Sequence, residues 1–362
     1  MLIPTVGSLA DEARPRPGGG GADPRDRRRH GRAHPPAPAR ARAGVEQRVD
    51  HEQAADDEQR ADDEQSAADE QPGAGRVGVV TDSTSSLSPD EIAAHGIEVV
   101  PLDVIWDGLS RPETDLADGE LVAALRAHKR VTTSRPSSQA FVEAYSHLVA
   151  QGAREIVSIH LSADASGTVA MARLASRAVS VPVHVVDSRT LAMGLGYGVL
   201  AAASARASSD GRGVAQAALA ASSATEVLFV VETLEYLRRG GRISMAGAVL
   251  GQALAVKPVL AVQDGGVVLK ERVRTMARAI ERLVEVISAR AARGGELLVT
   301  VQHLGAPERA DQLADRIAES VGTRPQVRSV GAVVGAHAGP GVVGVAIYAP
   351  GSRPETAGPA AR

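Results

Sequence analysis

The sequence predicts an α/β fold, with mainly parallel sheets and helices on their faces. From Arg76 onward, short β-branched runs alternate with Ala- and Leu-rich helical windows, and this alternation is typical of α/β architecture. Helix start signals follow strands directly, and polar or glycine-rich motifs stand at or near the ends of several strands. In open α/β sheets, binding sites lie at the carboxyl ends of the strands.

The first strand and the first helix carry clear signals. Residues 76–82, RVGVVTD, form a short apolar run of the kind found in buried strands. SPDE follows at Ser88, with Ser as the N-cap, Pro at the first helical position and Glu at the third. That helix is predicted to end at Gly96.

Eight later runs complete the predicted sheets. They lie at residues 97–102, 155–161, 181–187, 226–232, 256–262, 267–273, 296–302 and 341–348. Between two of these runs, Asp264-Gly265-Gly266 predicts a β-hairpin and hence one local antiparallel pair. The chain contains only one Trp, two Phe and four Tyr, so Val, Leu, Ile and Ala must fill the interior. A buried ligand site in such a core would be aliphatic.

The two ends of the chain are predicted to stay unfolded. Residues 1–44 carry a net charge of about +5, and residues 45–75 carry about −9 and repeat the tripeptide DEQ. A segment so poor in large apolar residues cannot offset the entropy lost on ordering. Residues 1–75 are therefore expected to be a disordered low-complexity tail, and residues 351–362 a flexible C-terminus. The charged blocks suggest binding to nucleic acid or a basic partner, but a solvated extension is favoured.

The folded part is predicted to span residues 76–350, with lobes at approximately 76–226 and 227–350. Beyond the tail, residues 76–362 carry a net charge of about +1, which argues against a nucleic-acid partner. No window approaches 18 apolar residues without a charge, so no membrane span is expected. The absence of cysteine excludes disulfides and thiolate metal sites, and it agrees with a reducing cytoplasm, the expected location.

No nucleotide-binding motif supports a cofactor. The sequence contains no GxxxxGK[ST] loop, and the glycines of MGLGYG at residues 193–198 follow a GxGxG spacing rather than GxGxxG. Neither a GxSxG elbow nor an HExxH motif is present. We therefore predict no cofactor and no metal site.

Four motifs concentrate polar side chains or glycine. They are TDSTSS at 81–86, TTSRPSSQAF at 132–141, LSADASGT at 161–168 and GAHAGPGVVG at 335–344. Ser166 and Gly167 precede a helical window, which is typical of an anion site, although an ordinary N-cap is the favoured interpretation for this motif taken alone. His337, in a glycine-rich loop, is as readily structural as ligand-contacting. Asp82, Ser166 and His337 could also be assembled as a hydrolase triad, because sequence distance does not forbid it.

In this order, the motifs resemble those of the DegV family, bacterial fatty-acid-binding proteins that include the acyl-carrier subunit of fatty acid kinase. The matching segments are VGVVTDSTSSLSPD, TTSRPSSQAF, LSADASGT, VVDSRTLAMGLG, LEYLRRGGRIS, ALAVKPVLAVQDGGVVLKERVRT and HAGPGVVGV. The resemblance covers Arg76 to about Pro350. It implies two α/β lobes with a long fatty acyl chain in a tunnel between them.

The resemblance also implies roles for individual residues. Thr133, Ser166 and His337 would hold the fatty-acid carboxylate, with Ser134 and Gly167 beside them. The protein would not be catalytic itself, because a separate ATP-dependent kinase would convert the bound carboxylate to an acyl phosphate. Arg242 and Arg274 would face that kinase, and transient contact with a membrane surface is compatible with this role.

Two positions depart from the family pattern. Arg135 stands where Gln is usual, and its side chain would add a cation to the carboxylate site if it turns inward, or alter the kinase-facing surface if it turns outward. Asp164 stands where small or apolar residues are common, at the expected mouth of the tunnel. Two alternatives remain: a carrier of another apolar carboxylate or lipid without a kinase partner, and a serine hydrolase acting through Ser166 and His337.

Overall fold

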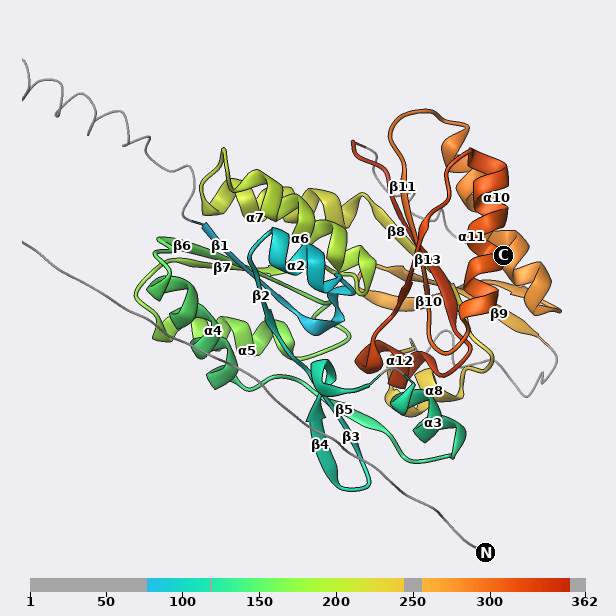
Figure 1. Ribbon diagram of the computed structural model, residues 1–362, viewed down its shortest axis with the longest axis horizontal. Coiled ribbons are helices and arrows are strands. Elements are labelled where there is room, and N and C mark those ends of the chain that lie inside the picture. Colours follow the sequence, from blue (N-terminus) through green and yellow to red (C-terminus); the bar gives the residue numbers. More distant parts are fainter. Residues whose placement is uncertain (1–76, 118, 244–255, 352–362) are drawn as a thin grey trace, which may run out of the picture. The chain divides into compact units, whose positions relative to one another are not determined.

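The computed structural model describes residues 77–117, 119–243 and 256–351 (Figure 1). The predicted tail at residues 1–75, and all but the first residue of the predicted flexible C-terminus at 351–362, lie outside these ranges. The described residues form two sheets of four and six strands and a smaller sheet of three strands. Helices accompany both large sheets, which confirms the predicted α/β class.

The first lobe is built on a parallel sheet with the strand order β2-β1-β6-β7. Its strands are β1 (Val77–Asp82), β2 (Ile97–Val100), β6 (Glu155–His160) and β7 (Val183–Asp187). All six residues of β1 are buried, as expected for a parallel strand covered on both faces. Figure 1 shows α4 (Ser138–Ala150) and α5 (Thr168–Ala175) on one face, and α6 (Met193–Ala205) and α7 (Gly211–Ser223) on the other.

The second lobe is built on a mixed sheet with the order β10-β9-β8-β13-β11-β12. Its strands are β8 (Thr225–Val230), β9 (Lys257–Gln263), β10 (Gly266–Val273), β11 (Leu298–His303), β12 (Gln326–Ser329) and β13 (Val343–Tyr348). Only β11 and β12 pair in parallel, whereas the other four pairings are antiparallel. The expectation of mainly parallel strands therefore needs correction for this lobe.

The connections explain this difference. Helix α11 (Pro307–Val321) connects β11 to the neighbouring strand β12, and a helical crossover of this kind joins parallel strands. Helix α10 (Met276–Ala291) instead leads from β10 to the non-adjacent β11. Both helices pack on the same face of the sheet in one core cluster. Alternation of strands and helices in the sequence does not distinguish these two kinds of connection.

The predicted hairpin is confirmed between β9 and β10. Gln263 pairs with Gly266, which leaves Asp264 and Gly265 as a two-residue loop. Both have positive φ, 50° and 87°, as a type I′ turn requires. Glycine tolerates this backbone conformation without strain, so the Asp-Gly pair fixes the antiparallel register of the two strands.

The sequence analysis missed the third sheet. It consists of β3 (Asp103–Trp106), β4 (Leu109–Pro112) and β5 (Thr132–Ser134), in the antiparallel order β4-β3-β5. These strands have three or four residues and no hydrophobic alternation, so periodicity could not reveal them. This sheet matters for function because β5 contains Thr133.

Short helices complete the described fold. They are η1 (Ser83–Ser85), α2 (Pro89–Ala94), η2 (Glu113–Asp115), α3 (Glu120–Arg126), η3 (Ser176–Ala178), α8 (Glu235–Gly240) and α12 (Ala332–Ala338). The capping box predicted for α2 is confirmed: the Ser88 hydroxyl accepts from the Glu91 amide at 3.2 Å, and the Glu91 carboxylate accepts from the Ser88 amide at 2.9 Å.

Helix α6 packs against both large sheets. Leu195 and Val199 belong to a core cluster with the apolar side chains of the first sheet, whereas Met193 and Tyr197 pack with Val227 on β8. The Tyr197 hydroxyl also hydrogen-bonds the Thr300 hydroxyl on β11 at 2.8 Å. Helix α6 therefore joins the two lobes.

The glycines of MGLGYG allow this close packing. A Cβ on Gly194 would lie 2.3 Å from the Thr190 hydroxyl oxygen, and one on Gly196 would lie 2.6 Å from the Ser85 carbonyl oxygen. The GxGxG spacing of this segment does not match a dinucleotide-binding turn, and close packing of a buried helix explains it instead.

Candidate functional site

A cavity of about 750 Å³ lies between the second sheet and the loops of the first lobe. Its wall includes six of the seven site residues predicted from the sequence: Thr133, Ser134, Ser166, Gly167, Arg242 and His337. These residues come from segments far apart in the chain. The fold therefore brings together the polar motifs that the sequence analysis singled out, with the exception of TDSTSS.

Four separate elements position these side chains. Thr133 and Ser134 lie on β5, and Ser166 and Gly167 lie in the loop that enters α5. His337 is in the last turn of α12. Arg242 follows α8, just after Gly241 ends that helix with a left-handed φ of 70°.

Thr133 and His337 form the central contact of the polar wall. The Thr133 hydroxyl and the His337 Nε2 are 2.8 Å apart, a hydrogen-bonding distance. The other side of the imidazole is closely covered, because a Cβ on Gly240 would lie only 2.2 Å from His337 Nδ1. A glycine at the end of α8 is thus needed for the imidazole to sit where it does.

The environment of His337 keeps its imidazole neutral. Burial lowers the pKa of His337, the positive charge of Arg242 lowers it further, and the resulting pKa is about 4. At neutral pH the imidazole therefore carries no charge. In the unliganded site the imidazole therefore supplies no charge-assisted hydrogen bond, and the positive charge beside it belongs to Arg242.

Arg242 is tied to the loop that carries Ser166. Its Nε donates to the Ala165 carbonyl oxygen at 3.0 Å, and its guanidinium also donates to the Gly240 carbonyl oxygen. The residue is exposed, yet it lines the cavity. Arg242 can therefore contact both a ligand head group and a molecule outside the cavity.

The Ser166 hydroxyl faces Thr168 at the entrance of α5. The two hydroxyl oxygens are 2.8 Å apart, and Gly167, the N-cap, supplies no side-chain cap. The free amides of the first turn are thus left to other acceptors. Helix α4 is different, because its N-cap, Ser137, accepts a hydrogen bond from the Ala140 amide at 3.1 Å through its side-chain hydroxyl.

Arg135 lies across the same helix entrance. A Cβ on Gly167 would come within 2.8 Å of Arg135 Cδ, and Arg135 lines the cavity although it is exposed overall. The orientation that the sequence left open is therefore toward the cavity mouth. A second guanidinium, in addition to that of Arg242, therefore lines the cavity.

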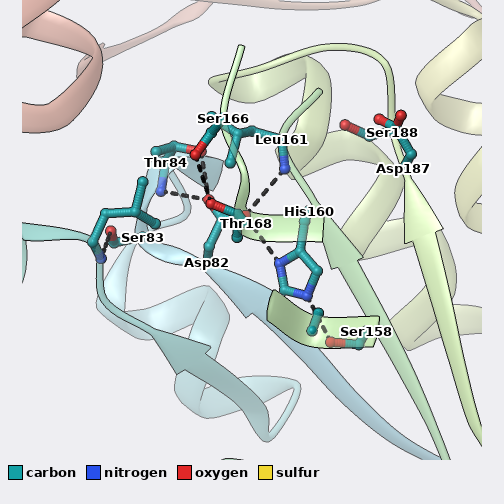
Figure 2. A network of polar contacts seen from close by, with 12 residues as sticks. Asp82, Ser83, Thr84, Ser158, His160, Leu161, Ser166, Thr168, Asp187 and Ser188 are labelled. Carbon is teal, nitrogen blue, oxygen red and sulfur yellow. Dashed lines mark hydrogen bonds and ion pairs between the residues drawn. The ribbon is translucent and has the colours of Figure 1, made fainter. Parts of the chain in front are cut away.

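TDSTSS contributes to a buried network instead (Figure 2). One Asp82 oxygen accepts from the Thr84 amide at 3.1 Å, and the other accepts from the Leu161 amide at 3.0 Å and lies 3.0 Å from His160 Nδ1. The Ser158 hydroxyl is 2.6 Å from His160 Nε2. Asp82, Ser158 and His160 are completely buried.

This network overturns the hydrolase triad considered from the sequence. Asp82 pairs with His160 and not with His337, while Ser166 pairs with Thr168 and His337 with Thr133. An Asp-His-Ser chain does exist, through Ser158, but it has no exposed atom for a substrate to reach. Sequence patterns did not single out His160, and the available signal was its position at the end of a predicted strand, directly before the motif LSADASGT.

The family of the chain follows from comparison with known proteins. A model of the DegV family, described as a family of uncharacterised proteins, matches residues 76–350. The chain belongs to the DegV family. A DegV domain-containing protein of Streptomyces coelicolor is 44% identical over 277 residues, which cover 75% of this chain and 98% of the relative. One from Deinococcus radiodurans is 38% identical over 280 residues, with the same coverage of both chains.

Solved DegV structures share the fold. A DegV family protein from Thermus thermophilus, described by its fatty acid binding, is 32% identical with a TM-score of 0.70, covering 76% of this chain and 100% of its own. DegV from Bacillus subtilis, described as a fatty acid binding protein, is 27% identical with a TM-score of 0.70, covering 76% and 99%.

The rest of the DegV cavity is lined by aliphatic side chains. They are Leu102, Leu161, Leu191, Val227, Leu228, Leu237, Ile243, Val267, Val330, Val333, Val334, Val342 and Val345. Among the described residues that line the cavity, Phe229 is the only Phe, Tyr or Trp. The aliphatic character expected of a buried site is therefore present, with a polar wall at one place.

Asp164 and Arg274, two positions considered from the sequence, differ in whether they line the cavity. Asp164 lines the cavity and lies 3.6 Å from the Arg189 guanidinium, near the β9–β10 turn, where a Cβ on Gly265 would be 2.8 Å from its carboxylate. Arg274 is exposed, follows β10 and is absent from the described cavity wall. The structure thus separates Arg274 from the other predicted site residues.

Neither a metal-binding cluster nor a membrane-spanning helix is found in the residues that the structure describes. They hold no cluster of three or more His, Asp or Glu side chains arranged to bind a metal ion. Among their helices, none is both long and apolar enough to cross a membrane.

Proposed function

We propose that this DegV protein binds a long-chain fatty acid, with the carboxylate at the polar wall and the hydrocarbon in the aliphatic part of the cavity. One observation carries the proposal: Thr133, Ser166, His337 and Arg242 come together on one wall of a cavity whose remaining lining is mainly aliphatic. The relatives from Thermus thermophilus and Bacillus subtilis, described as binding fatty acids, support it.

The chemistry of the wall suits a carboxylate. A buried carboxylate must be met by several hydrogen bonds or a positive charge, because removing it from water unpaired is prohibitive. The Thr133 and Ser166 hydroxyls and the His337 imidazole supply hydrogen bonds, and Arg242 supplies the charge. Charge-assisted hydrogen bonds of this kind are the stronger ones.

The aliphatic part supplies most of the affinity. Each buried CH₂ contributes about 0.8 kcal/mol, so a 16-carbon acid gains roughly 12 kcal/mol before the entropic costs of binding. The polar wall then orients the ligand and selects an acid over a neutral lipid.

The second part of the proposal concerns a partner. In this proposal the protein performs no chemistry itself and presents the carboxylate to a separate ATP-dependent kinase that forms an acyl phosphate. Arg242 and Arg274 are both exposed, as contacts to a partner must be. Arg242 also lines the cavity, so a kinase that docks beside it would meet the head group.

Native mass spectrometry of the purified protein tests the binding proposal directly. We expect a mass increment that denaturation releases, and that extraction and chromatography identify as a long-chain fatty acid. A different released acid or lipid would replace the ligand named here. Protein that carries no lipid, does not take up added palmitate and hydrolyses an acyl ester only while Ser166 is intact would overturn the proposal in favour of a hydrolase.

A further inference from the structure

Two arginine side chains approach the loop that carries Ser166, one on each side of it in the sequence. Arg242 Nε donates to the carbonyl oxygen of Ala165, directly before Ser166, at 3.0 Å. Directly after Ser166, a Cβ on Gly167 would lie 2.8 Å from Arg135 Cδ and 3.4 Å from its Nε. Both arginines line the cavity. Ser166 therefore has an arginine side chain next to each of its chain neighbours.

The same two arginines are connected to the other half of the polar wall. Arg135 directly follows β5, the strand that carries Thr133 and ends at Ser134. The Thr133 hydroxyl is 2.8 Å from His337 Nε2, and the charge of Arg242 lowers the pKa of that imidazole. Both arginines therefore belong to the wall that Thr133 and His337 form.

Neither guanidinium has a carboxylate partner among the described residues. Arg242 donates to two backbone carbonyl oxygens, those of Ala165 and Gly240. Arg135 makes no hydrogen bond or ion pair with a residue that the structure describes. A backbone carbonyl accepts a hydrogen bond but carries no net charge that would offset a guanidinium. Both positive charges are therefore available to a ligand.

The other titratable groups of the described lining do not cancel these charges. Asp164 is its only acidic residue, and the Asp164 carboxylate lies 3.6 Å from Arg189, a cation outside the described lining. His337 is neutral at pH 7, because its pKa is about 4. The described lining therefore presents a surplus of two positive charges, whereas the carboxylate of a fatty acid carries a single negative charge.

The start of α5 adds donors at the same place. Its N-cap, Gly167, provides no side-chain acceptor for the amides of the first turn, and such amides favour an anion. A phosphate group accepts through three terminal oxygens, whereas a carboxylate has two. The supply of donors and of charge thus exceeds what one carboxylate can use.

We propose that the polar wall holds a dianionic phosphate head group more tightly than a carboxylate, and that Arg135 is the residue that determines this specificity. The ligand is a long hydrocarbon chain that ends in a phosphate group. This inference rests on the proposed function, in which the acyl phosphate formed by the kinase carries such a head group. Arg135 has no other partner among the described residues, so its charge-assisted hydrogen bonds can all go to the phosphate.

Competition with a fluorescent fatty acid tests this preference on the whole protein. The competitors have chains of equal length: palmitate, hexadecyl sulfate, which is tetrahedral but carries a single charge, and hexadecyl phosphate, which is dianionic at about pH 8. We expect hexadecyl phosphate to bind about 10-fold more tightly than either of the others, which corresponds to about 1.4 kcal/mol. The comparison needs no variant, so it does not depend on the folding of a mutant.

The Arg135→Gln variant gives the second arm. It should weaken the binding of hexadecyl phosphate by about 10-fold and that of palmitate by at most about 3-fold, because the second negative charge loses its partner. Arg135→Lys keeps the charge and should retain most of the preference. Arg173, exposed on α5 and absent from the described lining, offers a matched control, because Arg173→Gln should leave all three affinities unchanged.

Three results would overturn this inference while palmitate binding leaves the proposed function standing. They are equal binding of palmitate and hexadecyl phosphate, equal binding of hexadecyl sulfate and hexadecyl phosphate, and a preference for phosphate that survives in Arg135→Gln. Failure of palmitate and of other long-chain acids to bind the unaltered protein would overturn the proposed function itself.

Discussion

The contact between Thr133 and His337 sets the state of the polar wall that we propose binds a carboxylate. Their side chains satisfy each other at 2.8 Å, so an incoming carboxylate must replace or share this hydrogen bond. With the pKa of His337 held at about 4 by burial and by Arg242, the imidazole meets the carboxylate as a neutral group. Attraction over a distance then comes from the guanidinium groups of Arg242 and Arg135.

We expect Thr133→Val to weaken fatty-acid binding by about 10- to 100-fold, because it removes a hydrogen bond to a charged group while preserving side-chain shape. Displacement of a fluorescent fatty acid measures the change. Thr132 offers a matched control: it is the preceding residue on β5 and is exposed, so Thr132→Val should leave affinity unchanged. Equal losses in both variants would indicate damage to β5 rather than loss of a ligand contact.

Helix α12, which carries His337, depends on a buried acid at its start. The Glu113 carboxylate in η2 accepts from the Val333 amide at 2.7 Å. Burial raises the pKa of Glu113 to about 7, and the nearby charge of Asp82 contributes to the rise, against the hydrogen bonds from Ser83 and Val333. The element that positions the imidazole is thus held by a group that titrates close to neutral pH.

Glu113→Gln should change how stability depends on pH. A carboxyl with a pKa raised from 4.5 to about 7 favours folding below pH 4.5, and this contribution is lost as the pH rises through 7. The Gln variant has no such loss and keeps an acceptor for the Val333 amide. Its free energy of unfolding, relative to wild type, should therefore increase by at most about 3 kcal/mol between pH 4.5 and 7.5.

Urea unfolding at a series of pH values measures this difference. Glu143→Gln, at an exposed position on α4, serves as the control and should show no comparable trend. His337 acts in the opposite direction, because its lowered pKa costs stability as the pH falls from 6.5 toward 4. The comparison with Glu113→Gln cancels this effect, since both proteins contain His337. A difference that stays constant across the range would contradict the role given to Glu113.

Sequence patterns predicted the elements with strong signals and missed those without. The nine predicted strands all exist, because each is a run of apolar or β-branched residues. The missed strands, β3, β4, β5 and β12, have three or four residues and are held by their pairing partners. Thr133 could be singled out from its motif, but its strand could not. Sequence patterns likewise could not predict the antiparallel pairing in the second sheet, because strand direction depends on which strands become neighbours.

The same limit applies to the site. Thr133, Ser166 and His337 were found because resemblance singled out their motifs, and the cavity brings them together. Gln302 stands in an apolar strand with no motif, and only the structure shows that it lines the cavity. The inward direction of Arg135 follows from its packing on Gly167, which no local sequence pattern encodes.

At the scale of the whole molecule, the proposed role as a carrier requires that ligand binding and presentation to a partner depend on different residues. The exposed Arg274 lies outside the described cavity wall, whereas Arg242 belongs to it. We expect Arg274→Ala to leave fatty-acid affinity unchanged and to depress acyl-phosphate formation with the proposed kinase. Arg242→Ala should reduce both, because it removes the charge beside His337 and the contact to Ala165.

Fatty-acid binding and radiolabelled acyl-phosphate formation are measured side by side for these variants. Arg272, exposed on β10 close to Arg274 in sequence, supplies the control: Arg272→Ala should affect neither activity. Equal losses of binding and transfer in Arg274→Ala would contradict a role confined to the partner.

The packing of α6 has a consequence for how the chain can be divided. The lobe boundary predicted between residues 226 and 227 falls within β8, where Thr225 and Glu226 already pair with Tyr348 and Ile347. A fragment ending there would uncover the side of α6 that carries Met193 and Tyr197. The complementary fragment would lose the cover of its own inner sheet face. Neither lobe is therefore expected to fold by itself, and fusions or truncations of this protein should retain all of residues 77–351.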